Sequence, residues 1–237
     1  FIFNIMVLRS PIKLKHVLII LLSIFLIYHI RSFILAAIAG PLFMSFGARL
    51  TKRYEKQFLT KLLLRSTIFL GGIFLFVQFF SSDFSSNMVA EAELVQSDFT
   101  ENETYTGKRY EISNTDASPA GLIRAVPESV FYGIYKPFIY ESLSPTLIMN
   151  GIESFVLMIL TLKFFISRDL FLKIKNIRKE EILVFSLIFA FFIAFMSGFT
   201  SVLFGVLVRI RAPLLPFFFL VLTANAVLIG KKAKIEK

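Results

Sequence analysis

Acidic and basic residues are distributed very unequally along this 237-residue chain. One long polar segment, residues 81–144, holds ten of the sixteen acidic residues but only four of the twenty-six basic ones. Most of the other charges are basic and stand beside apolar runs. Short cytoplasmic loops of membrane proteins collect Lys and Arg, whereas translocated segments do not. The pattern therefore predicts a membrane protein whose one large loop faces away from the cytoplasm.

The composition agrees with a membrane protein. The chain is 56% hydrophobic and contains thirty Phe, which exceeds the apolar share of ordinary soluble domains. Its net charge of +10 comes from short basic clusters at the ends of apolar runs, as anionic lipid headgroups favour, and not from one basic face with interleaved aromatics. We expect membrane lipids as partners and no nucleic acid. With no Cys and only two His, we expect no metal site and no cofactor.

Several apolar segments approach the roughly twenty residues that a membrane-spanning helix needs. The region 17–48 is ambiguous, because it could be one tilted helix or a hairpin of two short spans. Basic residues flank it on both sides, which requires an even number of crossings, so we predict the hairpin. The six predicted spans are residues 17–30, 33–48, 62–80, 146–165, 182–199 and 213–230.

These segments predict an all-α, polytopic membrane protein with about six spans and both termini in the cytoplasm. Residues 1–80 form an N-terminal membrane segment, residues 81–144 an extracytoplasmic loop, and residues 145–237 a C-terminal segment with three spans. The chain opens on Phe1 in what resembles the tail of an apolar run. We therefore expect a fragment of a longer protein.

The end of the polar loop differs from its beginning. Residues 81–119 are rich in small polar side chains and predict irregular structure. Residues 127–141 predict a short helix, because Pro127 suits a first helical position and apolar residues recur at helical spacing. With its Tyr rings, this amphipathic helix should lie on the outer membrane surface and break near Pro137.

Glu153 is the only acidic residue within a predicted span. An ionisable group at such a depth is a functional candidate by default. It could serve as a catalytic acid or base, or it could pair with a basic residue and fix helix packing. Asn150 lies three residues earlier on the same helical face and could connect Glu153 to the outer loop.

Arg209 and Arg211 lie on the outer side of the predicted topology, against the usual charge rule. If the connection that holds them is extended, residues two apart face the same way and present both guanidinium groups together. Paired arginines suit bidentate recognition of phosphate or carboxylate. If the connection is helical, the two side chains point apart. Both arginines could also be headgroup anchors.

Lys136 and Glu141 flank the aromatic turn that ends the loop. Together with Tyr140 and the two arginines, they could line a site for an anionic substrate at the outer leaflet. Since the loop contains no His, a proton acceptor there must be a carboxylate such as Glu141, or a group of the substrate.

Residues 123–165 and 205–220 carry a recognisable pattern. It consists of a proline, an apolar helix, a basic residue followed by Pro-Phe, an aromatic-Glu pair, a Glu in the next span, and Gly-x-Leu-x-Arg-x-Arg-x-Pro. The matching residues are Pro127, Pro137, Phe138, Glu141, Glu153, Arg209, Arg211 and Pro213. In this pattern the chain resembles the C-terminal half of a group of poorly characterised bacterial multispanning proteins associated with surface-polysaccharide assembly.

Three departures from that group are visible. Lys136 stands where the group has Arg, Tyr140 stands where it has Trp, and its upstream Gly-Gly-Ser appears here as Thr106-Gly107-Lys108. The first two keep charge and aromaticity. The resemblance implies a role in envelope-glycan assembly in a bacterial inner membrane, with a polyprenyl-phosphate-linked substrate.

Two functional hypotheses follow. In the first, the protein handles a lipid-linked glycan at the outer face, with Arg209 and Arg211 holding a phosphate and Glu141 or Glu153 acting as acid or base. In the second, it is a non-catalytic transmembrane subunit of an envelope secretion, motility or transport complex, packed against membrane-protein partners. Whether the protein is an enzyme stays open at this point.

Overall fold

The computed structural model describes residues 17–27, 29, 34, 37–38, 40–42, 59–60, 63, 66–67, 70–71, 110, 119–141, 144–201 and 203–223. The described elements are helices: α5 (Pro119–Tyr135), the 3-10 helix η1 (Ile139–Glu141), α6 (Pro145–Ile166), α7 (Leu170–Lys179), α8 (Glu181–Thr200), α9 (Phe204–Arg211) and a last helix, Leu214–Thr223. No β-strand occurs among these residues, so the all-α prediction is confirmed for this part of the chain.

Two of the described helices, α6 and α8, are long and apolar enough to cross a membrane. A third candidate span is the pair formed by α9 and Leu214–Thr223, which is bent by 63°. The described residues thus contain two or three candidate spans, fewer than the six predicted for the whole chain. Of the predicted N-terminal spans, only the apolar helix Val17–Ile27 is described as a continuous element, and it is shorter than a span.

The bounds of α6 and α8 lie within one residue of the predicted spans 146–165 and 182–199. Local sequence explains the start of α6. Ser144 has extended backbone angles, and its side chain accepts a hydrogen bond from the backbone N–H of Leu147, as an N-cap residue does. Pro145 follows at the first helical position, where its missing N–H costs nothing.

The third C-terminal span, predicted at 213–230, has a different form in the structure. The chain bends at the start of the predicted span, because α9 ends at Arg211 and a new helix starts at Leu214. Pro213 lies in that bend, and a proline favours a helix break because it has no backbone N–H to donate and its ring clashes with the preceding turn of a helix. Residues 224–230 lie outside the described residues.

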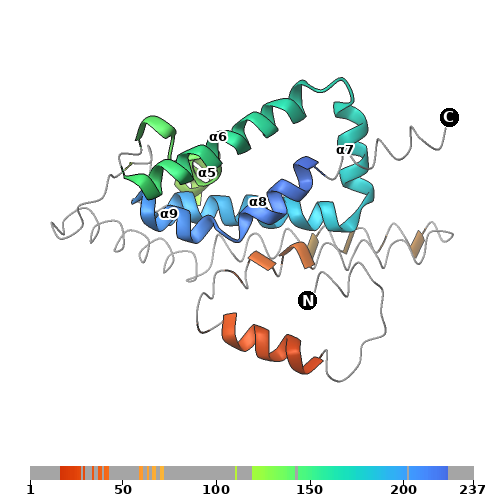
Figure 1. The fold of residues 1–237 in the computed structure, drawn as a ribbon. Coiled ribbons are helices and arrows are strands. Elements are labelled where there is room, and N and C mark those ends of the chain that lie inside the picture. Colours follow the sequence, from red (N-terminus) through yellow and green to blue (C-terminus); the bar gives the residue numbers. More distant parts are fainter. Residues whose placement is uncertain are drawn as a thin grey trace.

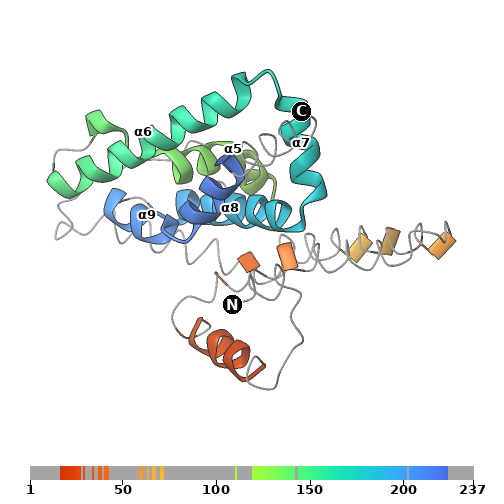
Figure 2. The ribbon, with the colours of Figure 1, turned by 45° about the vertical axis from the view of Figure 1, so that its right-hand side comes forward.

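The helix α8 forms the centre of this bundle. Its side chains Phe189 and Ile193 pack in one core cluster with Ile134 of α5, Leu157 of α6 and Leu214. In Figure 1, α6 and α8 lie close together at one end and diverge toward the other, where α7 joins them. Figure 2 shows α9 beside the start of α6, at the end opposite α7.

The helix α5 begins eight residues earlier than predicted. Pro119, not Pro127, is its first residue, and Pro127 lies inside it. The prediction of the start was therefore wrong, because both prolines fit a first helical position and the residues between them continue the helix. The predicted break near Pro137 is confirmed, since α5 ends at Tyr135 and η1 follows.

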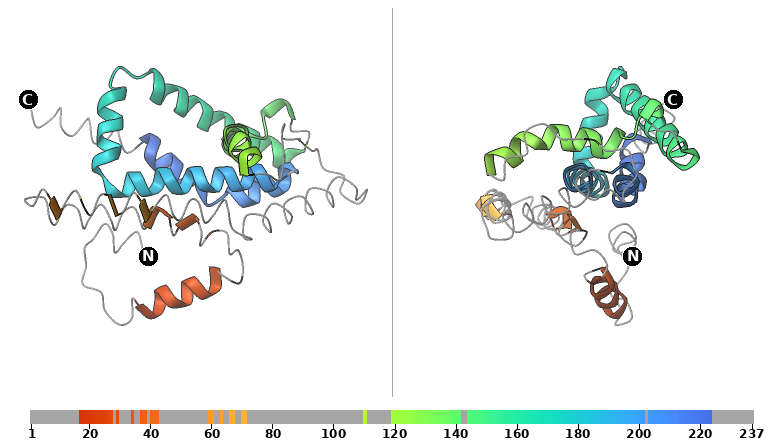
Figure 3. Two further views of the ribbon diagram at one scale, coloured as in Figure 1. Left: turned by 180° about the vertical axis from the view of Figure 1, so that it is seen from behind. Right: turned by 90° about the vertical axis from the view of Figure 1, so that its left-hand side faces the viewer.

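A stripe of small residues brings α5 against α8. On α5, Ala125, Ser129 and Gly133 recur every four residues and are buried, and α8 presents buried Ala190, Ala194 and Gly198 at the same spacing. Small residues at this spacing let two helix backbones approach closely. The right-hand view of Figure 3 shows α5 running across α8 and not alongside it.

Glycine is required at two points of this crossing. A Cβ added at Gly133 would overlap the backbone oxygen of Ala194, and a Cβ added at Gly198 would overlap the backbone oxygen of Ser129. Neither obstacle is the flexible end of a side chain, so the helices themselves would have to separate. The crossing therefore fixes the position of α5 along the axis of α8.

We predict that Gly133→Ala lowers the stability of the protein by roughly 1–3 kcal/mol, as overpacking of a tight core does. The measurement is thermal unfolding in detergent, followed by circular dichroism. Gly205→Ala is the matched control, because an added Cβ at Gly205 meets nothing within 4 Å. Equal melting temperatures for the two variants would contradict the role assigned to the α5–α8 crossing.

Candidate functional site

Arg211, the last residue of α9, is completely buried, with 0% of its surface exposed. Its Nη1 donates hydrogen bonds to the carbonyl oxygens of Ile134 (3.2 Å) and Lys136 (2.5 Å) and to Ser154 Oγ (2.9 Å). Its Nη2 donates to the carbonyl oxygen of Asn150 at 3.4 Å. One guanidinium group thus meets four acceptors from distant parts of the chain.

These acceptors come from the C-terminal end of α5 and from the first half of α6. The carbonyl groups of Ile134 and Lys136 are at the C-terminal end of α5, where the last carbonyls of a helix lack partners within it. A positive charge there is also favoured by the helix dipole. Ser154 and Asn150 belong to the first half of α6. Arg211 therefore joins α9 to both α5 and α6.

Glu153 is the carboxylate nearest to Arg211. Its Oε2 lies 3.9 Å from Nη2, and its side chain is 38% exposed. Of the two interpretations of Glu153, pairing with a basic residue at a helix contact is the one that this geometry favours. The carboxylate also offsets part of the cost of burying the arginine charge.

A second ion pair lies beside the first. Lys136 Nζ is 3.2 Å from Glu141 Oε1, and the side chains are 11% and 19% exposed. The other carboxylate oxygen, Oε2, accepts a hydrogen bond from the backbone N–H of Phe138 at 3.0 Å. Glu141 therefore closes the turn between α5 and η1 in addition to neutralising Lys136. The Lys136–Pro137 peptide bond in this turn is cis.

Three aromatic rings surround the ammonium group of Lys136. Its Nζ lies 4.3 Å from the ring centroid of Tyr132, 5.1 Å from that of Tyr110 and 5.6 Å from that of Phe204. Each ring is within the distance at which a cation is attracted to a π face. The ion pair and the rings together offset the cost of burying the positive charge of Lys136.

Tyr110 holds the aromatic group in place. Its hydroxyl donates a hydrogen bond of 3.1 Å to the carbonyl oxygen of Gly198, and its ring stacks on Phe204 with centroids 5.5 Å apart. Burial raises the pKa of Tyr110 well above its ordinary value, with a smaller contribution from Tyr132. The phenol therefore stays protonated and remains a donor throughout the physiological pH range.

Arg209 does not join this cluster. The segment that holds both arginines is helical, so the extended conformation that would have aligned them is absent. Arg211 is buried and Arg209 is exposed, because residues two apart in a helix point in different directions. The condition for a paired phosphate clamp, an extended segment, is therefore not met, and phosphate binding by Arg209 or Arg211 stays a prediction.

The other two predicted binding residues lie at the edge of the cluster. Tyr140, in η1, is 78% exposed and stacks on Phe138 with ring centroids 5.5 Å apart. Asn150 contributes its carbonyl oxygen to Arg211, whereas its side-chain amide donates back to the carbonyl oxygen of Thr146. Its side chain is thus engaged within α6.

The structure brings Arg211, Glu153, Lys136 and Glu141 together as an internal clasp between helices, and their role in binding a substrate stays a prediction. Among the described residues, no group of three or more His, Asp or Glu could hold a metal ion. Sequence analysis missed Tyr110 and Ser154. The available signal for Tyr110 was an aromatic ring within a polar segment, which Phe84, Phe99 and Tyr105 share, and the signal for Ser154 was a hydroxyl one turn after Asn150.

Comparison with known proteins adds no identity. No protein-family model, curated protein or solved structure matches this chain.

We predict that Arg211→Met destabilises the protein by roughly 2–6 kcal/mol, because it leaves the buried carbonyl oxygens of Ile134 and Lys136 without this donor, at about 1–3 kcal/mol each. Thermal unfolding in detergent measures the effect. Arg209→Met is the control, since a change on the exposed side of α9 should alter stability by about 0.5 kcal/mol or less. Similar losses in both variants would contradict the clasp.

We also predict that Tyr110→Phe costs about 1 kcal/mol, because it removes the hydrogen bond to the carbonyl oxygen of Gly198 and keeps the ring. Tyr140→Phe removes a hydroxyl from an exposed ring and serves as the control. The measurement is again the melting temperature in detergent. A Tyr110→Phe protein as stable as the Tyr140→Phe protein would exclude an energetic role for this hydrogen bond.

Proposed function

We propose that this chain is a multi-pass protein of a bacterial inner membrane, with about six spans and both ends of the segment in the cytoplasm. The charge distribution of the sequence supports this topology. The helices α6 and α8 coincide with two of the predicted C-terminal spans, and the bent pair overlaps the third in part. In this topology α5 belongs to the extracytoplasmic segment at the outer surface, and the basic helix α7 lies on the cytoplasmic side.

Within that membrane, the proposed role is envelope-glycan assembly, in which the protein handles a polyprenyl-phosphate-linked or other anionic lipid without performing a catalytic step. The resemblance of residues 123–165 and 205–220 to polysaccharide-assembly proteins supports the pathway. The complete burial of Arg211 supports the non-catalytic role. A phosphate cannot reach a guanidinium that has no exposed surface.

The candidate carboxylates support the same conclusion. Glu141 holds Lys136 and a backbone N–H, and Glu153 faces Arg211. A general acid or base must be able to reach the proton that it transfers. Turning Glu141 toward a substrate would break both of its internal contacts. Catalytic roles for Glu141 and Glu153 remain predictions from the sequence. The alternative is that both carboxylates serve only to pair with Lys136 and Arg211 inside the fold.

The test replaces the chromosomal gene in the source bacterium. Deletion should abolish or shorten the envelope glycan, whereas Glu153→Gln should leave its amount within about twofold of wild type, because a neutral amide keeps the size and polarity of the side chain at a half-exposed position. Glycan profiles on gels give the readout, and immunoblots give the amount of protein.

Two outcomes contradict the proposal in different ways. A wild-type glycan after deletion excludes the role in glycan assembly. Complete loss of glycan in Glu153→Gln at normal protein level excludes the non-catalytic role and favours acid–base chemistry at Glu153. Arg209→Ala serves as a further control, and loss of glycan in that variant would indicate that the exposed arginine binds the lipid phosphate.

The second candidate function is that of a non-catalytic transmembrane subunit of an envelope secretion, motility or transport complex. The outward face of α6 favours it. Large apolar side chains on this face, such as Met149 (73% exposed) and Ile152 (50% exposed), are not packed against the described fold. Such a face suits either lipid or a partner helix. Purification in mild detergent distinguishes them, since a stoichiometric protein partner on α6 supports the subunit.

A further inference from the structure

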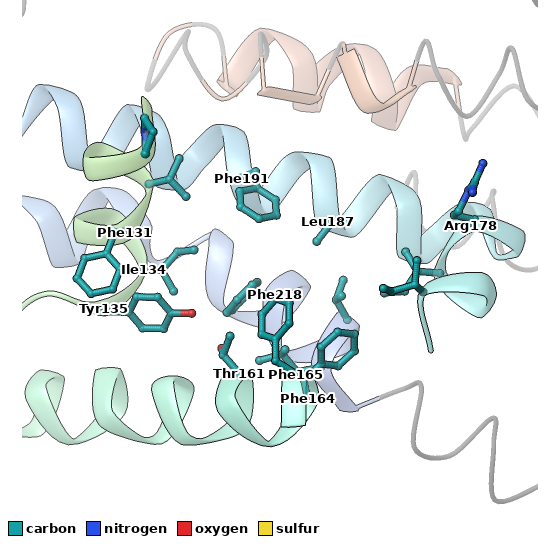
Figure 4. A pocket seen from close by; sticks show the side chains of 16 residues that line it. Phe131, Ile134, Tyr135, Thr161, Phe164, Phe165, Arg178, Leu187, Phe191 and Phe218 are labelled. Atoms are coloured by element: carbon teal, nitrogen blue, oxygen red, sulfur yellow. The ribbon is translucent and has the colours of Figure 1, made fainter. Parts of the chain in front are cut away.

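An apolar cavity of about 480 Å³ lies in the wedge between α6 and α8. Its size falls in the range of small-molecule sites. The walls come from α5, α6, α7, α8 and the last helix, and Figure 4 shows Phe131, Phe164, Phe191 and Phe218 around the space. Tyr135 and Thr161 contribute hydroxyl groups to its walls.

The cavity is open to its surroundings. Phe165, Phe191 and Phe131 line it and are 61%, 45% and 44% exposed. In a protein surrounded by a bilayer, such an opening meets hydrocarbon chains before it meets water. An opening of this kind suits one flexible chain of a lipid.

The end of the cavity at α7 carries positive charge. Arg178 lines it, and Figure 4 shows its guanidinium directed away from the apolar walls. Lys173 lies at the same end, with Nζ 5.1 Å from the ring centroid of Phe164, another lining residue. Residues 168–181 contain five basic and three acidic residues. Basic residues beside an apolar surface attract anionic headgroups.

We propose that this cavity binds an anionic phospholipid, with one acyl chain between α6 and α8 and the phosphate at Arg178. The proposal commits to a phospholipid because the apolar walls and the basic rim complement the two parts of such a molecule. It rests on the proposed membrane location and lipid-handling role. Its test uses purified protein and no glycan, so the two can fail separately.

The chain contains no Trp, so one introduced Trp is a specific fluorescence reporter. Phe191→Trp places the reporter at the cavity. Phe155→Trp is the matched control, because Phe155 has the same exposed fraction of 45% and does not line the cavity. The full chain is purified in detergent and titrated with phosphatidylglycerol or phosphatidylcholine brominated on the acyl chains, which quench a nearby Trp.

We expect saturable quenching at Phe191→Trp, with phosphatidylglycerol binding about fivefold more tightly than phosphatidylcholine, as roughly 1 kcal/mol per basic contact gives. Phe155→Trp should show weaker quenching that rises linearly with lipid. Adding Arg178→Gln to Phe191→Trp should bring the two lipids within about twofold of each other. Lys175→Gln removes the same charge from α7 at an exposed position that does not line the cavity, and it should keep the preference.

Several results would overturn the proposal. Identical quenching curves at the two Trp positions would show that lipid only surrounds the protein. Absence of quenching at Phe191→Trp would show that another occupant, such as a further part of the chain or a partner helix, fills the cavity. Saturable quenching with no preference for phosphatidylglycerol, or an equal loss of preference in Arg178→Gln and Lys175→Gln, would show that Arg178 does not recognise an anionic headgroup. Melting temperatures of all variants verify that each is folded.

Discussion

The buried guanidinium of Arg211 is the interaction on which this end of the bundle depends. It supplies donors to the carbonyl oxygens of Ile134 and Lys136, which α5 itself cannot satisfy, and it also bonds to Ser154 and Asn150 of α6. Glu153 provides the nearest opposing charge. Since α9 ends at Arg211 and the chain bends by 63° before the next helix, the same residue also lies where the bent candidate span changes direction. A hydrogen-bonding side chain thus organises a region rich in apolar contacts.

The close crossing of α5 and α8 makes this arrangement possible. Because Gly133 and Gly198 allow backbone contact, the C-terminal end of α5 lies next to α9 and the start of α6. Lys136 then falls among Tyr110, Tyr132 and Phe204 and pairs with Glu141. Packing of small residues and pairing of charges are therefore coupled, since separating α5 from α8 would also move the acceptors of Arg211.

The two ends of the bundle use their charges differently. At the end near α9, the cations Arg211 and Lys136 are buried and engaged by the chain itself. At the α7 end, the exposed Arg178 lines an apolar cavity and faces outward. A cation already compensated by internal acceptors contributes to stability, whereas an exposed cation beside an apolar opening can attract an anionic ligand. This contrast moves the proposed lipid site from the arginine pair to α7.

The sequence by itself determined the helical class and the bounds of α6 and α8, because long apolar runs, an N-cap Ser and a following Pro act locally. It also singled out Glu153, Glu141, Lys136 and Arg211 as charges near one end. Only the tertiary structure decided what they contact. Arg211 meets a carbonyl 77 residues away, and Tyr110 meets one 88 residues away. Backbone carbonyls carry no side-chain signature, so periodicity and composition cannot identify such distant partners. The sequence also could not decide whether the segment at Arg209 is extended or helical. In the folded protein it is helical, so the side chains of Arg209 and Arg211 point in different directions.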